Sequence, residues 1–242
     1  MSTNSCMLQV GNIEALVIRK PIKNLHLAVL PPAGKVRVSA PLTMKDDAIR
    51  TLLATRLAWI KKQQAKFVGQ ERQTRRDYVS GENHYLWGKR CRLEVVYENT
   101  PSSVSLKGKD KIILNIRPNS HRAKREQILM DWYRKELRVI ASNLIERWQK
   151  TIGVQLNAWG IKRMKTRWGT CNQKAGRIWL NLELTKKPEH CLEFIIVHEM
   201  THLLERSHND RFKAYLDRFM PRWRQYKEEL KRSVLSYERW NY

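Results

Sequence analysis

The sequence VHEMTH at residues 197–202 is the stretch from which the fold and function of this chain can be inferred. It contains the pattern H-E-x-x-H. Residues four apart lie one above the other on a helix, so His198 and His202 can direct two imidazole nitrogens at one metal ion. Glu199 then lies beside that ion, where a carboxylate can take a proton from water. This arrangement is typical of zinc hydrolases.

The residues around this pattern favour a helix that begins after Pro188. Apolar residues recur there at helical spacing, and they are Leu192, Ile195, Ile196, Leu203 and Leu204. A buried helix can also carry histidines that only pack, so a further ligand is needed to indicate a metal site.

His208 is the nearest candidate for a third ligand, because a catalytic zinc takes three protein ligands. On an unbroken helix, the six residues from His202 would turn His208 about 240° away. His208 can therefore reach the ion only if the helix ends between them. Ser207, Asn209 and Asp210 are residue types that begin helices, so we expect a break at this point. Carboxylates of the next helices are the alternative ligands, and they are Asp217, Glu228 and Glu229.

The chain is strongly basic. Its 242 residues include 47 Lys and Arg against 23 Asp and Glu, which gives a net charge of +24. Such a charge attracts polyanions, so we expect nonspecific contact with nucleic acid or with acidic substrates as one possible use of the surface. A basic surface that serves only solubility is the alternative. The length allows one large domain or two small ones.

The four cysteines lie far apart and form no C-x-x-C pattern, which is typical of free thiols in a reducing compartment. They are Cys6, Cys91, Cys171 and Cys191. The first residues lack a basic region followed by an apolar run, and no apolar run approaches the roughly 18 residues that span a bilayer. We therefore expect a cytoplasmic protein with no membrane segment.

Most of the remaining chain alternates between strand and helix patterns. Residues 7–40 predict short strands, with a hairpin around Pro31 to Gly34. One helix is expected from Asp46 to about residue 67, and polar residues 69–84 predict a loop. Residues 85–116 predict a small meander of strands, and 121–150 a long helix. Residues 177–184 alternate as a strand. No internal repeat is visible.

Several motifs together resemble the YgjP-like, SprT-related zinc metallopeptidase family, and the resemblance covers most of the chain. The motifs are RWGTC at 167–171, IWLN at 178–181 with Leu184, VHEMTHL at 197–203, His208 with Phe212 and Pro221, and YLWG at 85–88. The chain departs from the family's usual serine at Thr170 and at Asn209. Both changes keep a small polar side chain.

The resemblance implies a zincin core in which a small sheet packs on the metal-binding helix. It implies His198, His202 and His208 as ligands of one Zn²⁺ per chain, and Glu199 as the general base. In zincins, a strand before this helix borders the cleft and can pair with an extended peptide. We therefore expect the strand 177–184 to border the cleft, with Asn181 and Arg167 as candidate substrate contacts. For Asn181, a purely structural place at a sheet edge is the alternative.

We expect an α+β protein with a β-rich N-terminal region and one helix in residues 1–118, and a zincin-like metallopeptidase core in residues 119–242. The expected function is zinc-dependent hydrolysis of peptide bonds in a protein or peptide substrate, by Glu-assisted attack of zinc-bound water. Two alternatives remain. One is a metal-dependent hydrolase of nucleotide phosphoanhydrides, and the other is a DNA-associated protein with a protease-like fold.

Overall fold

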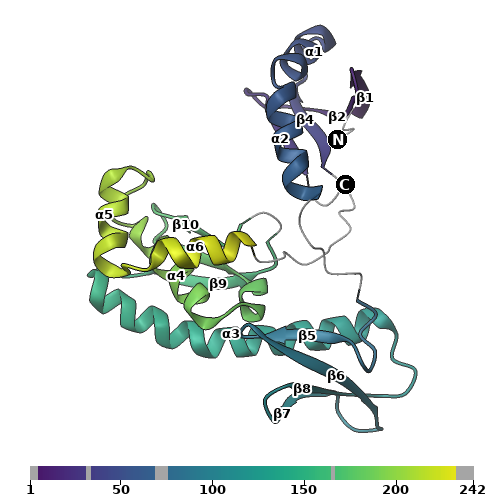
Figure 1. Ribbon diagram of the computed structural model, residues 1–242, viewed down its shortest axis with the longest axis vertical. Helices are drawn as coiled ribbons and strands as arrows, with labels where there is room; N and C mark the ends of the chain where they lie inside the picture. Colours follow the sequence, from purple (N-terminus) through teal and green to yellow (C-terminus); the bar gives the residue numbers. More distant parts are fainter. Residues whose placement is uncertain (1–4, 31–33, 69–75, 165–166, 233–242) are drawn as a thin grey trace. The chain divides into compact units, whose positions relative to one another are not determined.

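The computed structural model describes residues 5–30, 34–68, 76–164 and 167–232. The chain forms two compact units that divide between Thr74 and Arg75. Each unit combines helices with a sheet (Figure 1), so the expected α+β class is confirmed. No helix in the described ranges is long and apolar enough to cross a membrane.

The first unit is built on a four-stranded sheet with the order β1-β2-β4-β3. Its strands are β1 (Ser5–Val10), β2 (Ile13–Lys20), β3 (His26–Leu30) and β4 (Lys35–Pro41). β3 and β4 pair antiparallel, as the predicted hairpin requires, while β2 and β4 pair parallel at the centre. Alternate apolar residues of these two central strands are buried, which gives the sheet one core face.

Two helices cover this core, α1 (Asp46–Thr55) and α2 (Leu57–Val68). The prediction of one continuous helix is therefore wrong at Arg56, where φ and ψ are −99° and 8°. Leu53 and Ile60 are fully buried on either side of this break. Because they are seven residues apart, about two helical turns, the apolar spacing does not reveal the break.

The second unit begins with another four-stranded sheet, and its order is β5-β6-β8-β7. Its strands are β5 (Asn83–Leu86), β6 (Lys89–Tyr97), β7 (Ser103–Lys107) and β8 (Lys111–Ile116). The predicted meander is wrong, because β8 lies between β6 and β7 and runs parallel to β6. β6 and β8 bury alternate apolar residues, whereas β7 is mostly exposed. The two apolar strands therefore take the central places and the polar strand takes the edge.

The sheets of the two units share one topology. In both, two antiparallel pairs are joined by a parallel pair at the centre. Ala15 pairs with Val36 in the first sheet, and Leu93 pairs with Ile112 in the second. The two sheets share the pattern of buried positions but not the residues at those positions, so the sequence shows no repeat.

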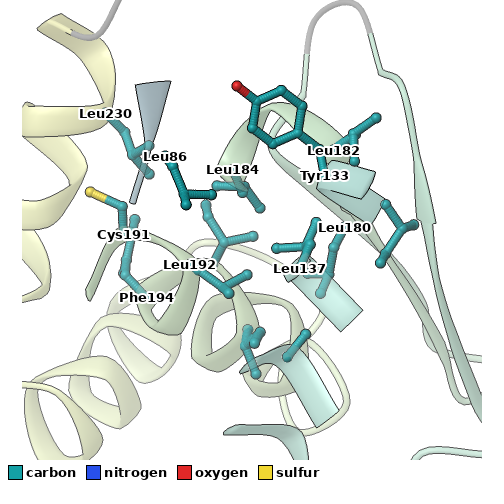
Figure 2. Close-up of a cluster of buried hydrophobic side chains, with 14 of the residues drawn as sticks. Leu86, Tyr133, Leu137, Leu180, Leu182, Leu184, Cys191, Leu192, Phe194 and Leu230 are labelled. Carbon is teal, nitrogen blue, oxygen red and sulfur yellow. The ribbon is translucent and has the colours of Figure 1, made fainter. Parts of the chain in front are cut away.

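The long helix α3 (Arg122–Ile152) joins the second sheet to the rest of its unit. The hydroxyl of Tyr133 donates to the carbonyl of Tyr85 in β5 at 2.9 Å, and Trp148 near the other end donates to Glu193 at 2.9 Å. Figure 2 shows Leu86 of β5 among buried side chains from α3 and from the segments that follow it. The expected boundary at residue 118 therefore falls inside one shared core, and the division lies instead near residue 74.

A three-stranded sheet follows α3, with the order β10-β11-β9. Its strands are β9 (Ala158–Lys162), β10 (Gly169–Asn172) and β11 (Arg177–Asn181). The predicted strand 177–184 ends early, because Asn181 begins a 3₁₀-helix, η1 (Leu182–Lys186), by accepting from the Glu183 N–H. Three helices complete the unit, α4 (Glu189–Thr201), α5 (Asp210–Phe219) and α6 (Trp223–Arg232).

Candidate metal centre

The last turn of α4 carries the H-E-x-x-H residues. His198 and His202 lie on one face, with ring centroids 5.0 Å apart, as their spacing predicts. α4 ends at Thr201, and His202 is its C-cap. The backbone carbonyl of Glu205 lies 3.1 Å from His202 Nδ1, so that nitrogen can donate while Nε2 keeps a lone pair. Metal-binding histidines usually have such a partner.

The predicted helix break between His202 and His208 is confirmed. Asn209 caps α5, and its side chain accepts from the Phe212 N–H at 3.0 Å. The intervening turn brings His208 Nε2 to 3.1 Å from His202 Nε2 and to 3.0 Å from His198 Nε2. The Phe212 ring packs against all three imidazoles. Local capping chemistry thus gathers three nitrogens at one point.

These three nitrogens fit a zinc ion. Nitrogens bound to one tetrahedral zinc at about 2.0–2.1 Å lie roughly 3.3 Å apart, close to the separations found here. Burial, followed by the charges of His202 and His208, lowers the pKa of His198 to about 3, and burial also lowers the pKa of the other two. The imidazoles are therefore neutral at pH 7, the form that binds metal.

The buried Nδ1 of His198 has no hydrogen-bond partner among the described residues. Its ring therefore depends on packing for its orientation. Phe194 and Phe212 contact its edges, with ring centroids 5.8 Å and 5.0 Å away.

Glu199 is buried beside this cluster, with 6% of its surface exposed. Burial raises the pKa of its carboxyl to about 8, and the charge of Arg167 opposes that rise. The strand β10 crosses directly over the carboxylate at Gly169. A Cβ on Gly169 would lie 2.6 Å from Glu199 Oε1 and 2.8 Å from Ile195 Cγ2. Glycine is therefore required for the strand to approach the carboxylate this closely.

The alternative carboxylate ligands have other partners. Asp217 accepts from the Trp223 indole at 2.7 Å and pairs with Arg224, and Glu229 pairs with His190 at 2.6 Å. Within the described ranges, the group of possible ligand atoms around His208 contains only the three histidines. The geometry therefore favours His208 over Asp217, Glu228 and Glu229.

An open cleft of about 730 Å³ lies over the histidines and Glu199. β10 and the turn after it form one wall, and the loop from His202 to His208 forms another. Arg167, predicted as a substrate contact, lines this cleft and is exposed. β11 is the central strand of its sheet and β10 is an edge strand, so the expectation that β11 offers a free edge is wrong.

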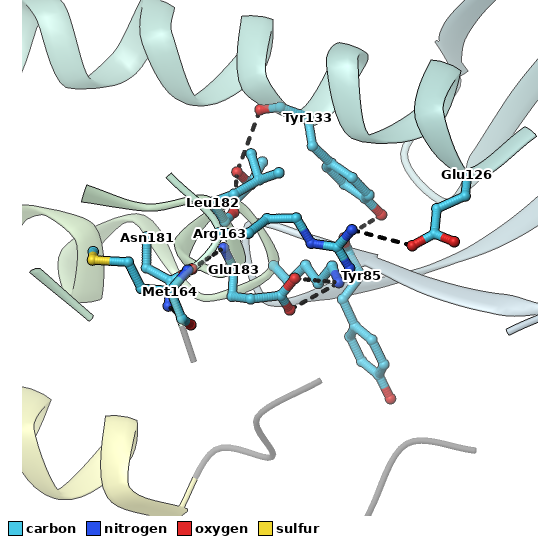
Figure 3. A network of polar contacts seen from close by, with 10 residues as sticks. Tyr85, Glu126, Tyr133, Arg163, Met164, Asn181, Leu182 and Glu183 are labelled. Carbon is cyan, nitrogen blue, oxygen red and sulfur yellow. Dashed lines mark hydrogen bonds and ion pairs between the residues drawn. The ribbon is translucent and has the colours of Figure 1, made fainter. Parts of the chain in front are cut away.

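The proposed substrate contact of Asn181 is also wrong, because this side chain is fully buried. Its amide nitrogen donates to the carbonyls of Met164 and Arg167 at 2.7 and 2.8 Å. Figure 3 shows Asn181 turned toward Met164. Asn181 therefore fixes the backbone that leads into β10.

The cleft residues that were not identified from the sequence include Gly169, Lys174 and Arg206. Gly169 belongs to the RWGTC motif, but nothing in the motif reveals which side chain it must admit. Lys174 and Arg206 are two among many basic residues. Only their positions, in the turn after β10 and in the loop before His208, distinguish them.

Comparison with known proteins gives a family match and matches to solved structures. The model of a family described as YgjP-like, metallopeptidase domain, matches residues 23–233. Curated protein sequences give no match. The crystal structure of the metallopeptidase zymogen abylysin of Pyrococcus abyssi is 21% identical over 39% of this chain and 99% of that chain, with a TM-score of 0.35. The zymogen jannalysin of Methanocaldococcus jannaschii is 18% identical over 37% of this chain and 92% of that chain, with a TM-score of 0.33.

Proposed function

Given that the chain belongs to the YgjP-like metallopeptidase family, we propose that it is a zinc-dependent peptidase in which Glu199 acts as the general base. His198, His202 and His208 would hold one zinc ion. The proposal rests on the convergence of their three Nε2 atoms. The Nε2 atom of His208 lies 3.1 Å from that of His202 and 3.0 Å from that of His198. A structural zinc usually has four protein ligands, whereas three ligands leave a position for reaction.

When bound, zinc supplies Lewis-acid chemistry, which makes water more acidic and a peptide carbonyl more electrophilic. The chain supplies the proton transfers. Glu199 takes a proton from the attacking water as the water oxygen bonds to the carbonyl carbon of the peptide. Glu199 then gives that proton to the amide nitrogen as the C–N bond breaks. The burial of Glu199 favours its neutral form, and the positive charge of a held ion favours the carboxylate that this step needs.

β10 provides a place for the peptide backbone. Among the described residues, β11 is its one paired neighbour, so its outer edge can accept an extended peptide as an added strand. Such a peptide lies along Gly169 to Asn172, with its carbonyl groups passing beside Glu199.

Replacing Glu199 with glutamine tests the mechanism. The change keeps the shape of the side chain and removes its proton acceptor, so peptide hydrolysis should fall by about 10²–10⁴-fold. Zinc content, measured by elemental analysis, should stay at one per chain. Glu189→Gln is the matched control, because Glu189 is exposed in the first turn of the same helix. Hydrolysis by Glu199→Gln at the parent rate, with zinc unchanged, would exclude Glu199 as the base.

A parallel assay separates peptide from nucleotide hydrolysis. The zinc-loaded protein is given casein and, separately, nucleoside triphosphates. We expect cleavage of casein that is lost on chelation and restored by zinc. Nucleotide hydrolysis that depends on Glu199, without casein cleavage, would show that the protein is a phosphoanhydride hydrolase instead.

A further inference from the structure

We infer that the cleft binds acidic peptides, with substrate carboxylates contacting Lys174 and Arg206 at one end of β10 and Arg167 at the other. This inference rests on the proposed peptidase function and specifies its substrate class. It depends on where the positive charges of the cleft lie, and not on the net charge of the chain.

Three cationic side chains from three different segments line the cleft. Arg167 precedes β10, Lys174 lies in the turn after β10, and Arg206 lies in the loop between two of the histidines. All three are exposed. Among the residues that the structure describes, Glu199 is the one carboxylate in the lining, and it serves the reaction. The cleft therefore presents net positive charge to a bound chain.

The three cations occupy two ends of the cleft. The side chain of Gln173 donates to the carbonyl of Leu203 at 3.3 Å, which holds the turn that carries Lys174 against the loop that carries Arg206. Arg167 lies at the opposite end of β10, where its charge acts on Glu199. Positive charge thus lies on both sides of the position where the peptide bond is cleaved.

These cations form no ion pairs with protein carboxylates in the part of the chain that the structure describes. Other surface cations of the same unit do, including Lys213 with Asp210 at 2.8 Å. Glu205, next to Arg206 in the sequence, does not line the cleft, and its carboxylate accepts from the Ser207 N–H at 3.2 Å. The cleft cations are therefore available to pair with negative charges on a ligand. Because these cations are exposed, pairing costs them little hydration free energy.

The spacing of the cations fits an extended peptide better than a phosphate chain. At about 3.3 Å per residue, the four residues of β10 extend about 10 Å, and the cations lie near both ends of that length. A phosphate chain requires its contacts to converge on a short segment. We therefore expect acidic side chains about four residues apart, one on each side of the scissile bond.

The test uses the zinc-loaded full chain and three internally quenched peptides. They share one sequence and differ only in carrying Glu, Gln or Lys on both sides of the cleavable segment. The Glu peptide should have a kcat/KM about tenfold above that of the Gln peptide, a few-fold for each exposed ion pair. This ratio should shrink as salt is raised from about 50 mM to about 500 mM, because exposed charges are screened.

The double variant Lys174→Glu with Arg206→Glu should prefer the Lys peptide. The control is Lys109→Glu with Lys135→Glu, which changes the net charge equally at exposed positions on the β7–β8 turn and on α3. This control should keep the parent preference. Equal cleavage of Glu and Gln peptides would overturn the inference and leave the peptidase function intact. An equal change of preference in both double variants would also overturn the inference, because the net charge of the chain, and not the charge of the cleft, would then set the peptide preference.

Peptide binding provides a readout that does not depend on hydrolysis. Fluorescence anisotropy on the Glu199→Gln variant should show tighter binding of the Glu peptide than of the Gln peptide, by about the same factor. If the parent cleaves no peptide but this difference in binding holds, the proposed function fails, and only the binding of acidic peptides by the cleft is supported. If binding is equal for both peptides, the inference fails. Hydrolysis of nucleoside triphosphates in place of peptides would overturn both.

Discussion

Replacing Gly169 with alanine tests whether β10 positions the general base. The added methyl carbon would lie 2.6 Å from Glu199 Oε1, 2.7 Å from Glu199 Cγ and 2.8 Å from Ile195 Cγ2. Nonbonded carbon atoms make contact at about 3.5–4.0 Å, so strand and carboxylate must separate by roughly 1 Å. Glu199 and Ile195 are both buried residues of α4. The strand therefore cannot keep its position unless the Glu199 carboxylate moves.

The expected result is a loss of activity with the metal retained. A misplacement of about 1 Å at a reacting group can cost about a hundredfold in rate, so kcat/KM for a peptide should fall by about that factor. Overpacking also costs about 1–3 kcal/mol of stability, which corresponds to a decrease in Tm of a few degrees for a protein of this size. Zinc content should stay at one per chain, because the atoms nearest the new methyl group belong to Glu199 and Ile195 and not to the histidines.

Gly160→Ala is the matched control. It adds a methyl group to β9 of the same sheet, 2.3 Å from the Trp179 ring, so it overpacks the sheet without touching Glu199. It should lower Tm and leave kcat/KM within a few-fold of the parent. If Gly169→Ala keeps the parent kcat/KM, or loses no more activity than Gly160→Ala, β10 does not position the base.

Three further predictions concern the metal, the pH dependence of stability and the charge. His208→Ala should lose most of the zinc measured by elemental analysis while Asp217→Ala retains it, and the reverse result would reassign the third ligand. Burial, and to a smaller extent the charge of Arg76, lowers the pKa of His84 from 6.5 to about 4. Between pH 4 and pH 6.5, His84 therefore binds a proton in the unfolded chain and not in the folded chain. The contribution of His84 to stability in urea should therefore be complete above pH 6.5 and fall by roughly 2–3 kcal/mol toward pH 4. His84→Phe should remove that contribution, while the pH dependence due to His198, whose pKa is also lowered, remains. The net charge of +24 predicts DNA binding that is indifferent to sequence and weakens by about 0.7–0.9 in log K per log salt for each phosphate contact, and an anisotropy titration at about 50 mM salt without micromolar binding would contradict it.

The parts of the site that could be predicted depend on short-range geometry. The spacing of His198 and His202 fixes both on one face of any helix, whatever surrounds it. The helix break before His208 follows from Asn209, whose side chain can cap only the helix that it begins. Each of these inferences needs a window of about ten residues or fewer, and within such windows the sequence is sufficient.

The strand order could not be predicted in the same way. β8 lies between β6 and β7, so its partners depend on which strands bury the most apolar surface, and not on which strands are adjacent in the sequence. Likewise, β10 has four small or polar residues and no apolar alternation. Its place at the edge, and therefore in the cleft, follows only from the pairing of β11 with both of its neighbours.

Asn181 illustrates how a motif residue can serve a site that it does not touch. Its amide holds the carbonyls of Met164 and Arg167, and its own backbone N–H donates to the carbonyl of Trp168 at 2.8 Å. These bonds fix the segment that leads to Gly169, which in turn presses on Glu199. From the sequence pattern, Asn181 and Arg167 are equal candidates for substrate contact, because both are polar residues close to the metal-binding helix. Burial separates them, because the fully buried amide can only support the chain, while the exposed guanidinium of Arg167 remains available to a substrate.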